Sequence, residues 1–138
     1  MACPGCYPTA ALLALEPLAA ADLLDGDVFI DAKSGISGAG KTPSERTHFS
    51  ECHGNVSAYG VFAHRHAAEI EQELSRAAGA PLRLTFTPHL VPMTRGILVT
   101  AYAMAAGGSI LLPELQAMAI TPINPHQLTQ RQMILDAK

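Results

Sequence analysis

The segment from His64 to Gly79 constrains the fold of this chain more than any other, because its helical periodicity is the clearest in the sequence. Apolar residues recur along it every three or four positions and fall on one helical face: Ala67, Ile70, Leu74 and Ala77. Gly79 stands where helices commonly end. The sequence PLRLTFTP (81–88) follows and alternates apolar with polar residues, which predicts a half-buried strand. The chain should therefore combine an amphipathic helix with a sheet.

A second helix is predicted close to the N-terminus. The run PTAALLAL (8–15) consists of helix formers, so this helix should begin just beyond Cys6. Pro17 is expected to end or kink it. The sequence LAAADLL (18–24) then predicts a second short helical piece that Gly26 closes.

Two more strands are predicted, DVFIDAK (27–33) and GILVTAYAM (96–104). The turn VPMTRG between the strand in 81–88 and the strand at 96–104 is too short for a crossover helix. We therefore expect these two strands to be antiparallel neighbours. Residues 34–47 follow the strand predicted at 27–33, and their sequence predicts a glycine-rich loop.

Composition bounds the class of protein. The 138 residues suffice for one domain, with 49% hydrophobic and 15% charged residues. Nine Lys and Arg against 12 Asp and Glu give a net charge of -3 without a basic run, which argues against nucleic-acid binding. Neither a membrane-spanning stretch nor a secretory signal is visible, so a cytoplasmic protein without membrane contact is expected. Three cysteines without a signal sequence indicate free thiols.

The stretch GISGAGKT (35–42) matches the P-loop pattern of nucleotide triphosphatases and follows a predicted strand. A P-loop needs a helix that starts at its Lys-Thr pair, but Pro43 disfavours helical geometry at Thr42. No later strand ends in the aspartate expected to position magnesium. A P-loop nucleotide binder is thus a weak alternative, and a loop whose amides contact a phosphate-bearing cofactor is the better interpretation.

The stretch CPGC, from Cys3 to Cys6, has the spacing of thiol-disulfide exchange enzymes, but no strand precedes it. A reversible Cys3–Cys6 disulfide and a passive Cys3 both remain open. A zinc site would need further ligands, and five residues offer them at spacings that fit no common zinc pattern: His48, Cys52, His53, His64 and His66. We therefore expect no metal, and we expect Cys52 to be a buried or half-buried thiol.

Cys6 itself stands at the predicted mouth of a helix, where the helix dipole and unpaired amides stabilise a thiolate. A nucleophile needs a base, and HRHAAEIE offers His64, His66 and a carboxylate on Glu69 within a few residues. We expect the side chains of Cys6 and His64 to converge across one cleft, although the sequence separates them widely.

Five segments together resemble a known family: ACPGCYPT, DAKSGISGAG, HFSE, HRHAAEIEQEL and FTPHLVPMTRGI. In order and spacing they are similar to the catalytic domain of the N-acetyl-gamma-glutamyl-phosphate reductases, arginine-biosynthesis enzymes related to aspartate-semialdehyde dehydrogenase. The resemblance implies an α+β fold, with a mixed or antiparallel sheet and helices packed on one face. It covers about residues 2–103. Residues 1–103 would thus be a fragment of the catalytic domain, which binds substrate and dimerises, and 104–138 a divergent tail of unknown structure.

The resemblance also implies an activity, the NADP-dependent reductive dephosphorylation of N-acetyl-L-glutamyl 5-phosphate to the 5-semialdehyde. Cys6 would attack the acyl phosphate and form a thioester, and His64 would accept and later return a proton. NADP(H) would supply the hydride. The partners implied are a small acyl-phosphate substrate and further copies of the same chain in a homo-oligomer.

Further site residues follow from the same resemblance. Residues that would bind substrate are Ser34, Arg65, Glu69 and Arg95. Residues that would approach the cofactor, where larger side chains do not fit, are Ser37, Gly38, Ala39 and Gly40.

The chain also departs from the family pattern. Cys3 replaces an asparagine, the sequence contains no G-x-G-x-x-G turn of a dinucleotide-binding (Rossmann) domain, and the family pattern stops after Tyr102. The alternative function is therefore a folded remnant of such an enzyme that interacts with a partner without catalysis.

Overall fold

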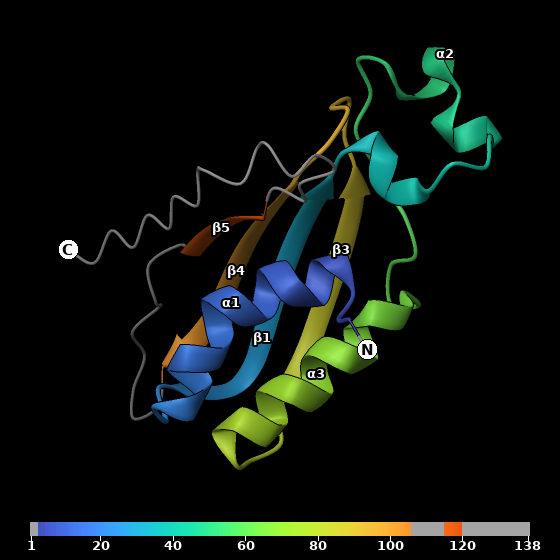
Figure 1. Cartoon of the computed structure of the whole chain (residues 1–138). Coiled ribbons are helices and arrows are strands. Elements are labelled where there is room, and N and C mark those ends of the chain that lie inside the picture. The colour runs from blue at the N-terminus through green and yellow to red at the C-terminus, as the bar shows by residue number, and fades with distance from the viewer. Residues whose placement is uncertain (1–2, 106–114, 120–138) are drawn as a thin grey trace.

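The computed structural model describes residues 3–105 and 115–119 of the chain. Within them, a five-stranded sheet carries two long helices on one face (Figure 1). Helix α1 spans Cys6–Ala20 and helix α3 spans Arg65–Ala78, and the two lie side by side across the strands. The predicted α+β fold, with a mixed sheet and helices on one face, is confirmed.

The sheet has the strand order β2-β3-β1-β4-β5. The strands are β1 (Leu24–Ser34), β2 (Ser57–Ala58), β3 (Arg83–Leu90), β4 (Ile97–Ala105) and β5 (Leu115–Ala119). The central strand β1 pairs parallel with β3 and antiparallel with β4, and the two short edge strands pair antiparallel with their neighbours. Parallel pairing is possible for β1 and β3 because α3 lies in the connection between them.

The expectation that the strands in 81–88 and at 96–104 are neighbours is wrong, because β1 lies between them. Crossing one intervening strand requires about 10 Å, which a connection as short as residues 91–96 reaches without a helix. This connection is hydrogen-bonded to the end of β1. Val91 N–H donates to the carbonyl of Ser34 at 3.0 Å, and Gly35 N–H donates to the carbonyl of Gly96 at 2.9 Å.

The second helical piece predicted at 18–24 is also not present. Helix α1 continues through Pro17, which is exposed, and ends at Ala20. Leu24 already belongs to β1, and Gly26, with φ of 70°, lies where the pairing with β4 shifts between Asp25 and Val28. This glycine therefore marks a β-bulge rather than a helix end.

Helix α3 agrees closely with its prediction. His64 precedes it as the N-cap residue, and Gly79 follows it in the left-handed region with φ of 66°. Its buried side chains are His66, Ile70 and Leu74. They pack with the apolar face of α1 and with the inner face of the sheet, and this core fixes the starts of both helices relative to each other.

Residues 37–63 form an exposed segment, called here the outer segment, in which no residue is buried. It contains most of the turn η1 (Ile36–Ala39), the turn η2 (Glu45–Thr47) and the short helix α2 (Phe49–Cys52). Figure 1 shows α2 beyond the end of the sheet. The described helices include none that is long and apolar enough to cross a membrane.

Strand β5 lies inside the region 104–138 that we expect to be a divergent tail. The sequence AAGGS (105–109) resembles a linker, and LTQRQMILDAK (128–138) is compatible with a short amphipathic helix. Both stretches fall almost wholly outside the described residues. The domain boundary after residue 103 stays a prediction.

Candidate active site

A cleft of about 900 Å³ opens where α1 and α3 begin. Cys6, His64 and His66 line it together with residues of the glycine-rich loop and of the outer segment. Cys6 and His64 thus line the same cleft, as the sequence led us to expect, and their chemical roles stay a prediction.

The start of α1 is joined directly to α3 through Gly5, the N-cap residue of α1. Gly5 N–H donates to the Glu69 carboxylate at 3.2 Å, and a Cβ atom at position 5 would lie only 2.5 Å from Nε2 of His66. Glycine is required here because the imidazole packs against its Cα. Gly5, the residue before Cys6, is therefore held against α3 by both packing and a hydrogen bond.

His64 is fixed by a hydrogen bond from its own helix. Its Nδ1 accepts from the backbone N–H of His66 at 3.2 Å, so in the neutral ring the proton resides on Nε2. The ring also packs edge-to-face against aromatic neighbours. Its centroid lies 5.6 Å from those of Tyr7 and Tyr59, and 5.5 Å from that of Phe86.

Both imidazoles favour the neutral form. Burial lowers the pKa of His64, and the neighbouring His66 and Arg65 lower it further. Burial also lowers the pKa of His66, helped by Arg65 and partly opposed by Glu69. Nδ1 of His66 is buried and has no hydrogen-bond partner among the described residues. At neutral pH the cleft therefore contains two uncharged rings that are able to take part in proton transfer.

Two tyrosines beside the cleft were not identified from the sequence. The hydroxyl groups of Tyr7 and Tyr59 lie 2.9 Å apart, and the Tyr7 hydroxyl also donates to the carbonyl of His89 at 3.3 Å. Burial raises the pKa of both phenols, so they stay protonated. The available signal was position, since Tyr7 follows Cys6 directly.

The glycine-rich loop borders the cleft, and many of its amides are already hydrogen-bonded. Ser34, Gly38 and Ala39 line the cleft, whereas Ser37 and Gly40 are not among its lining residues. The N–H groups of residues 35–38 and 40 all donate to backbone carbonyls, so a phosphate could not be bound by them without breaking these bonds. No helix starts at residue 41, and this speaks against the P-loop interpretation.

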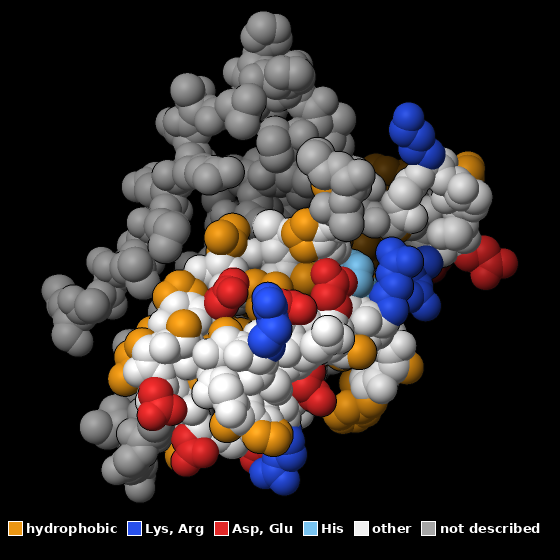
Figure 2. Space-filling view, turned by 60° about the horizontal axis from the view of Figure 1, so that its bottom comes forward, with side chains coloured by type: hydrophobic (Ala, Val, Ile, Leu, Met, Phe, Trp, Pro, Cys, Tyr) orange, Lys and Arg blue, Asp and Glu red, His pale blue; other side chains and the backbone are white. Residues whose placement is uncertain are grey.

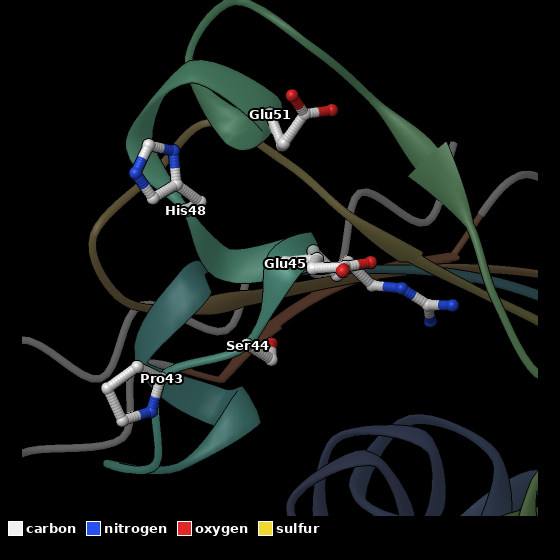
Figure 3. Close-up of a pocket in the computed structure, with 6 residues that line it drawn as sticks. Pro43, Ser44, Glu45, His48 and Glu51 are labelled. Carbon is white, nitrogen blue, oxygen red and sulfur yellow. The ribbon is translucent and has the colours of Figure 1, made fainter.

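Of the two arginines expected to bind substrate, Arg65 and Arg95, only one lies at the cleft. Arg65 lines the cleft, whereas Arg95 is exposed in the β3–β4 connection and is not among the lining residues. Arg46, which the sequence analysis did not select, lines the cleft from η2. It also borders the neighbouring hollow of Figure 3, which lies between η2 and α2 and is lined by Glu45, Glu51 and His48.

The remaining cysteines stand apart from this arrangement. Cys3 is exposed and Cys52 is partly buried, and both are free thiols, as is Cys6. Within residues 3–105 and 115–119, no group of three His, Cys, Asp or Glu side chains is placed to hold a metal ion.

Known proteins resemble this chain in sequence and in fold. Residues 6–118 match the family model described as "Semialdehyde dehydrogenase, dimerisation domain". The chain is 58% identical over 104 residues to N-acetyl-gamma-glutamyl-phosphate reductase of Desulforudis audaxviator (strain MP104C). It is 52% identical over 99 residues to the enzyme of the same name of Thermoanaerobacter sp. (strain X514). These matches cover 75% and 72% of this chain, and the chain spans only 30% and 29% of the length of those relatives.

Among solved structures, aspartate semialdehyde dehydrogenase II from Vibrio cholerae has a similar fold, with a TM-score of 0.57 at 15% sequence identity. The similarity covers 77% of this chain and 38% of that one. The resemblance noted from the five sequence segments is thereby confirmed.

Proposed function

Because the chain belongs to the family of semialdehyde dehydrogenase dimerisation domains, we propose that it carries the nucleophile-bearing part of an N-acetyl-gamma-glutamyl-phosphate reductase. The reaction is the NADP-dependent reduction of N-acetyl-L-glutamyl 5-phosphate to the 5-semialdehyde in arginine biosynthesis, a cytoplasmic pathway. One observation carries the proposal: Cys6 opens α1 inside the cleft that His64 and His66 also line.

The thiolate of Cys6 attacks the acyl carbon and phosphate departs, which leaves an acyl thioester on the sulfur atom. The position of Cys6 at N1 of α1 supports this step, because a helix N-terminus favours negative charge. Glu69 and Gly5 act as positioning residues, since their hydrogen bond and the contact of Gly5 with His66 keep the sulfur-bearing residue beside an imidazole.

The two histidines divide the proton transfers. His64, whose Nδ1 already accepts a backbone hydrogen bond, presents Nε2–H and acts as the donor to the oxygen that develops charge. His66 is neutral and packs beside the start of α1, and it accepts the thiol proton. This assignment refines the expectation that His64 does both.

The residues present fit the cofactor only in part. Gly38 and Ala39 offer a cleft wall with small side chains that a flat nicotinamide ring could approach, but the amides of residues 35–38 and 40 already donate to backbone carbonyls. When bound, the cofactor supplies the hydride that reduces the thioester. The loop would hold the ring end of NADP(H), and the phosphates require other groups.

The thioester step can be tested on this chain without a cofactor. Freshly prepared N-acetyl-gamma-glutamyl phosphate should add one N-acetylglutamyl group to the protein, measured by intact mass and located on Cys6 by peptide mapping. Cys6→Ser should abolish the thioester, and Cys52→Ser should leave it unchanged. A correctly folded chain that is never acylated on Cys6 would refute the proposal and favour a non-catalytic remnant.

A further inference from the structure

Arg46 occupies an unusual position for an exposed arginine. It belongs to η2 in the outer segment, and it lines the cleft that contains Cys6. Its guanidinium carbon lies 5.5 Å from the centroid of the Tyr59 ring, within the range of a cation–π contact. Tyr59 is held in turn by the hydrogen bond between its hydroxyl and that of Tyr7. The guanidinium therefore lies against an aromatic ring whose hydroxyl is hydrogen-bonded to Tyr7, a buried residue of the core.

The charge of Arg46 is not paired with a carboxylate among the described residues. Within the described residues, neither Arg46 nor Arg65 takes part in an ion pair, although other basic side chains of the fold do, for example Arg83 with Asp27 and Arg76 with Glu73. Both guanidinium groups line the same cleft, and Glu45 is the one carboxylate among its lining residues. Figure 2 shows basic side chains gathered beside a patch of histidine surface. The cleft is thus locally positive in a chain whose net charge is -3.

We propose that Arg46 binds an oxyanion of the substrate, a carboxylate or a phosphate, and that it is the second guanidinium of the site together with Arg65. A planar guanidinium that is already oriented by an aromatic ring loses less freedom when it forms paired hydrogen bonds to such a group. Arg46 takes the place that the sequence suggested for Arg95, which lies outside the cleft lining. The identity of the substrate rests on the proposed function, but the charge of the cleft does not.

The first experiment measures this charge at Cys6. The 138-residue chain is alkylated with iodoacetate, which is an anion, and with neutral iodoacetamide, and peptide mass spectrometry gives the rate at Cys6 for each reagent. The ratio of the iodoacetate rate to the iodoacetamide rate should fall severalfold in Arg46→Gln, because the attraction for the anion is lost. Arg46→Lys should keep most of the ratio, and Glu45→Gln should raise it.

Lys41→Gln is the matched control, because it removes one positive charge from the same outer segment at a residue that does not line the cleft. The ratio should stay at its wild-type value in this variant. An Arg46→Gln ratio equal to that of the wild type would overturn the inference. So would an equal loss in Arg46→Gln and Lys41→Gln, since a general field rather than a site would then explain the result.

The second experiment distinguishes the two sources of the oxyanion. N-acetyl-L-glutamate and inorganic phosphate are each titrated as protectors of Cys6 against iodoacetamide. If Arg46 binds the carboxylate end of the substrate, Arg46→Gln should raise the half-protecting concentration of N-acetyl-L-glutamate severalfold. If Arg46 binds the phosphate, Arg46→Gln should instead raise the half-protecting concentration of inorganic phosphate severalfold. Unchanged protection by both would overturn the inference even if Cys6 is acylated. Conversely, an effect of Arg46 without acylation of Cys6 would refute only the proposed function.

Discussion

The two sides of the Cys6 cleft are built in opposite ways. On the helix side, Cys6, His64 and His66 come from the starts of α1 and α3, which pack on a common core. On the other side, Glu45 and Arg46 come from the outer segment 37–63, in which no residue is buried. Much of the outer segment's hydrogen bonding is local, such as that between the hydroxyls of Ser44 and Thr47 at 2.9 Å.

This difference matches the demands of the two tasks that we propose, catalysis on the helix side and anion binding on the other. Proton transfer and nucleophilic attack tolerate little displacement, so their groups belong on packed elements. Recognition of a charged group by a guanidinium tolerates more, and elements with few buried contacts open locally at low free energy. We expect substitutions on the helix side to change global stability, and substitutions in the outer segment to change mainly how the cleft binds.

The largest expected effect comes from emptying the core under the helix side. Ile70, on α3, is fully buried, so Ile70→Ala should lower the free energy of unfolding by about 2–5 kcal/mol. Val56, in the outer segment, is 59% exposed, and Val56→Ala should change the free energy of unfolding by less than about 0.5 kcal/mol. Urea unfolding followed by circular dichroism measures both. Similar losses at the two positions would contradict the contrast between the two sides.

Gly5→Ala tests the contact between the helix starts. The added methyl group would lie 2.5 Å from Nε2 of His66, and such overpacking typically costs about 1–3 kcal/mol. Backbone strain does not contribute, because φ of Gly5 is -63°.

The double variant Gly5→Ala/His66→Ala supplies the control for this prediction. If the cost of the methyl group arises from the imidazole, adding it to a His66→Ala background should cost much less than adding it to the wild type. Equal costs in both backgrounds would show that His66 is not the group in contact.

Phe62, in the outer segment, should show the opposite effect. Removal of its side chain should stabilise the protein instead of destabilising it. Ala63 N–H donates to the carbonyl of Gly60 at 3.0 Å, which closes a turn, and Phe62 occupies the position in it with φ of 58°. The left-handed region is costly for an aromatic residue, and this side chain is 85% exposed. Phe62→Gly should therefore raise the unfolding free energy by about 1 kcal/mol.

Asp22→Gly is the matched variant for Phe62→Gly. Asp22 also has a positive φ, of 57°, but aspartate tolerates this region better than phenylalanine does, so its gain should be smaller. Thermal unfolding of both variants gives the comparison. A loss of stability in Phe62→Gly would show that the aromatic side chain makes contacts that its exposure conceals.

The smallest expected effect is the dependence of stability on pH. The pKa of His66 is lower in the folded chain than in the unfolded chain, so the unfolded state takes up the proton first as the pH falls. The contribution to stability is thus complete above the ordinary histidine pKa of about 6.5 and is lost progressively below it. Unfolding free energies between pH 7.5 and 5 should decline, and His66→Gln should flatten part of this decline.

Glu69→Gln sharpens the same measurement. The Glu69 carboxylate raises the pKa of His66, so its neutralisation should lower that pKa further, which NMR titration of the ring would show. An unchanged His66 titration in Glu69→Gln would mean that the carboxylate does not act on this ring.

Local signals in the sequence were sufficient for the helix side. The apolar period from Ala67 to Ala77 and the glycine at position 79 predicted α3, and the helix formers after Cys6 predicted that α1 begins there. These features depend on neighbours in the sequence, so a single sequence reveals them. The expected meeting of Cys6 and His64 rested instead on chemistry, because a nucleophile needs a base and no local pattern joins the two residues.

Long-range pairing explains what the sequence did not reveal. Whether β3 pairs directly with β4 or with β1 between them depends on contacts between strands that are distant in the sequence. The short connection at 91–96 is compatible with both arrangements. The Tyr7–Tyr59 hydrogen bond joins residues 52 positions apart, and the place of Arg46 over the Tyr59 ring depends on the path of the outer segment. None of these contacts leaves a periodic trace in the chain.

The hydrogen bonds between the glycine-rich loop and the β3–β4 connection have a consequence for motion. Ile36 N–H donates to the carbonyl of Met93 at 2.8 Å, and Ser37 N–H donates to that of Thr94 at 3.0 Å. Two turns that are distant in the sequence thus move as one body, and deuterium should replace the amide protons of this loop at rates typical of a strand rather than of a glycine-rich loop. A displacement of the connection, which crosses the end of β1, would therefore also move the cleft wall formed by Gly38 and Ala39.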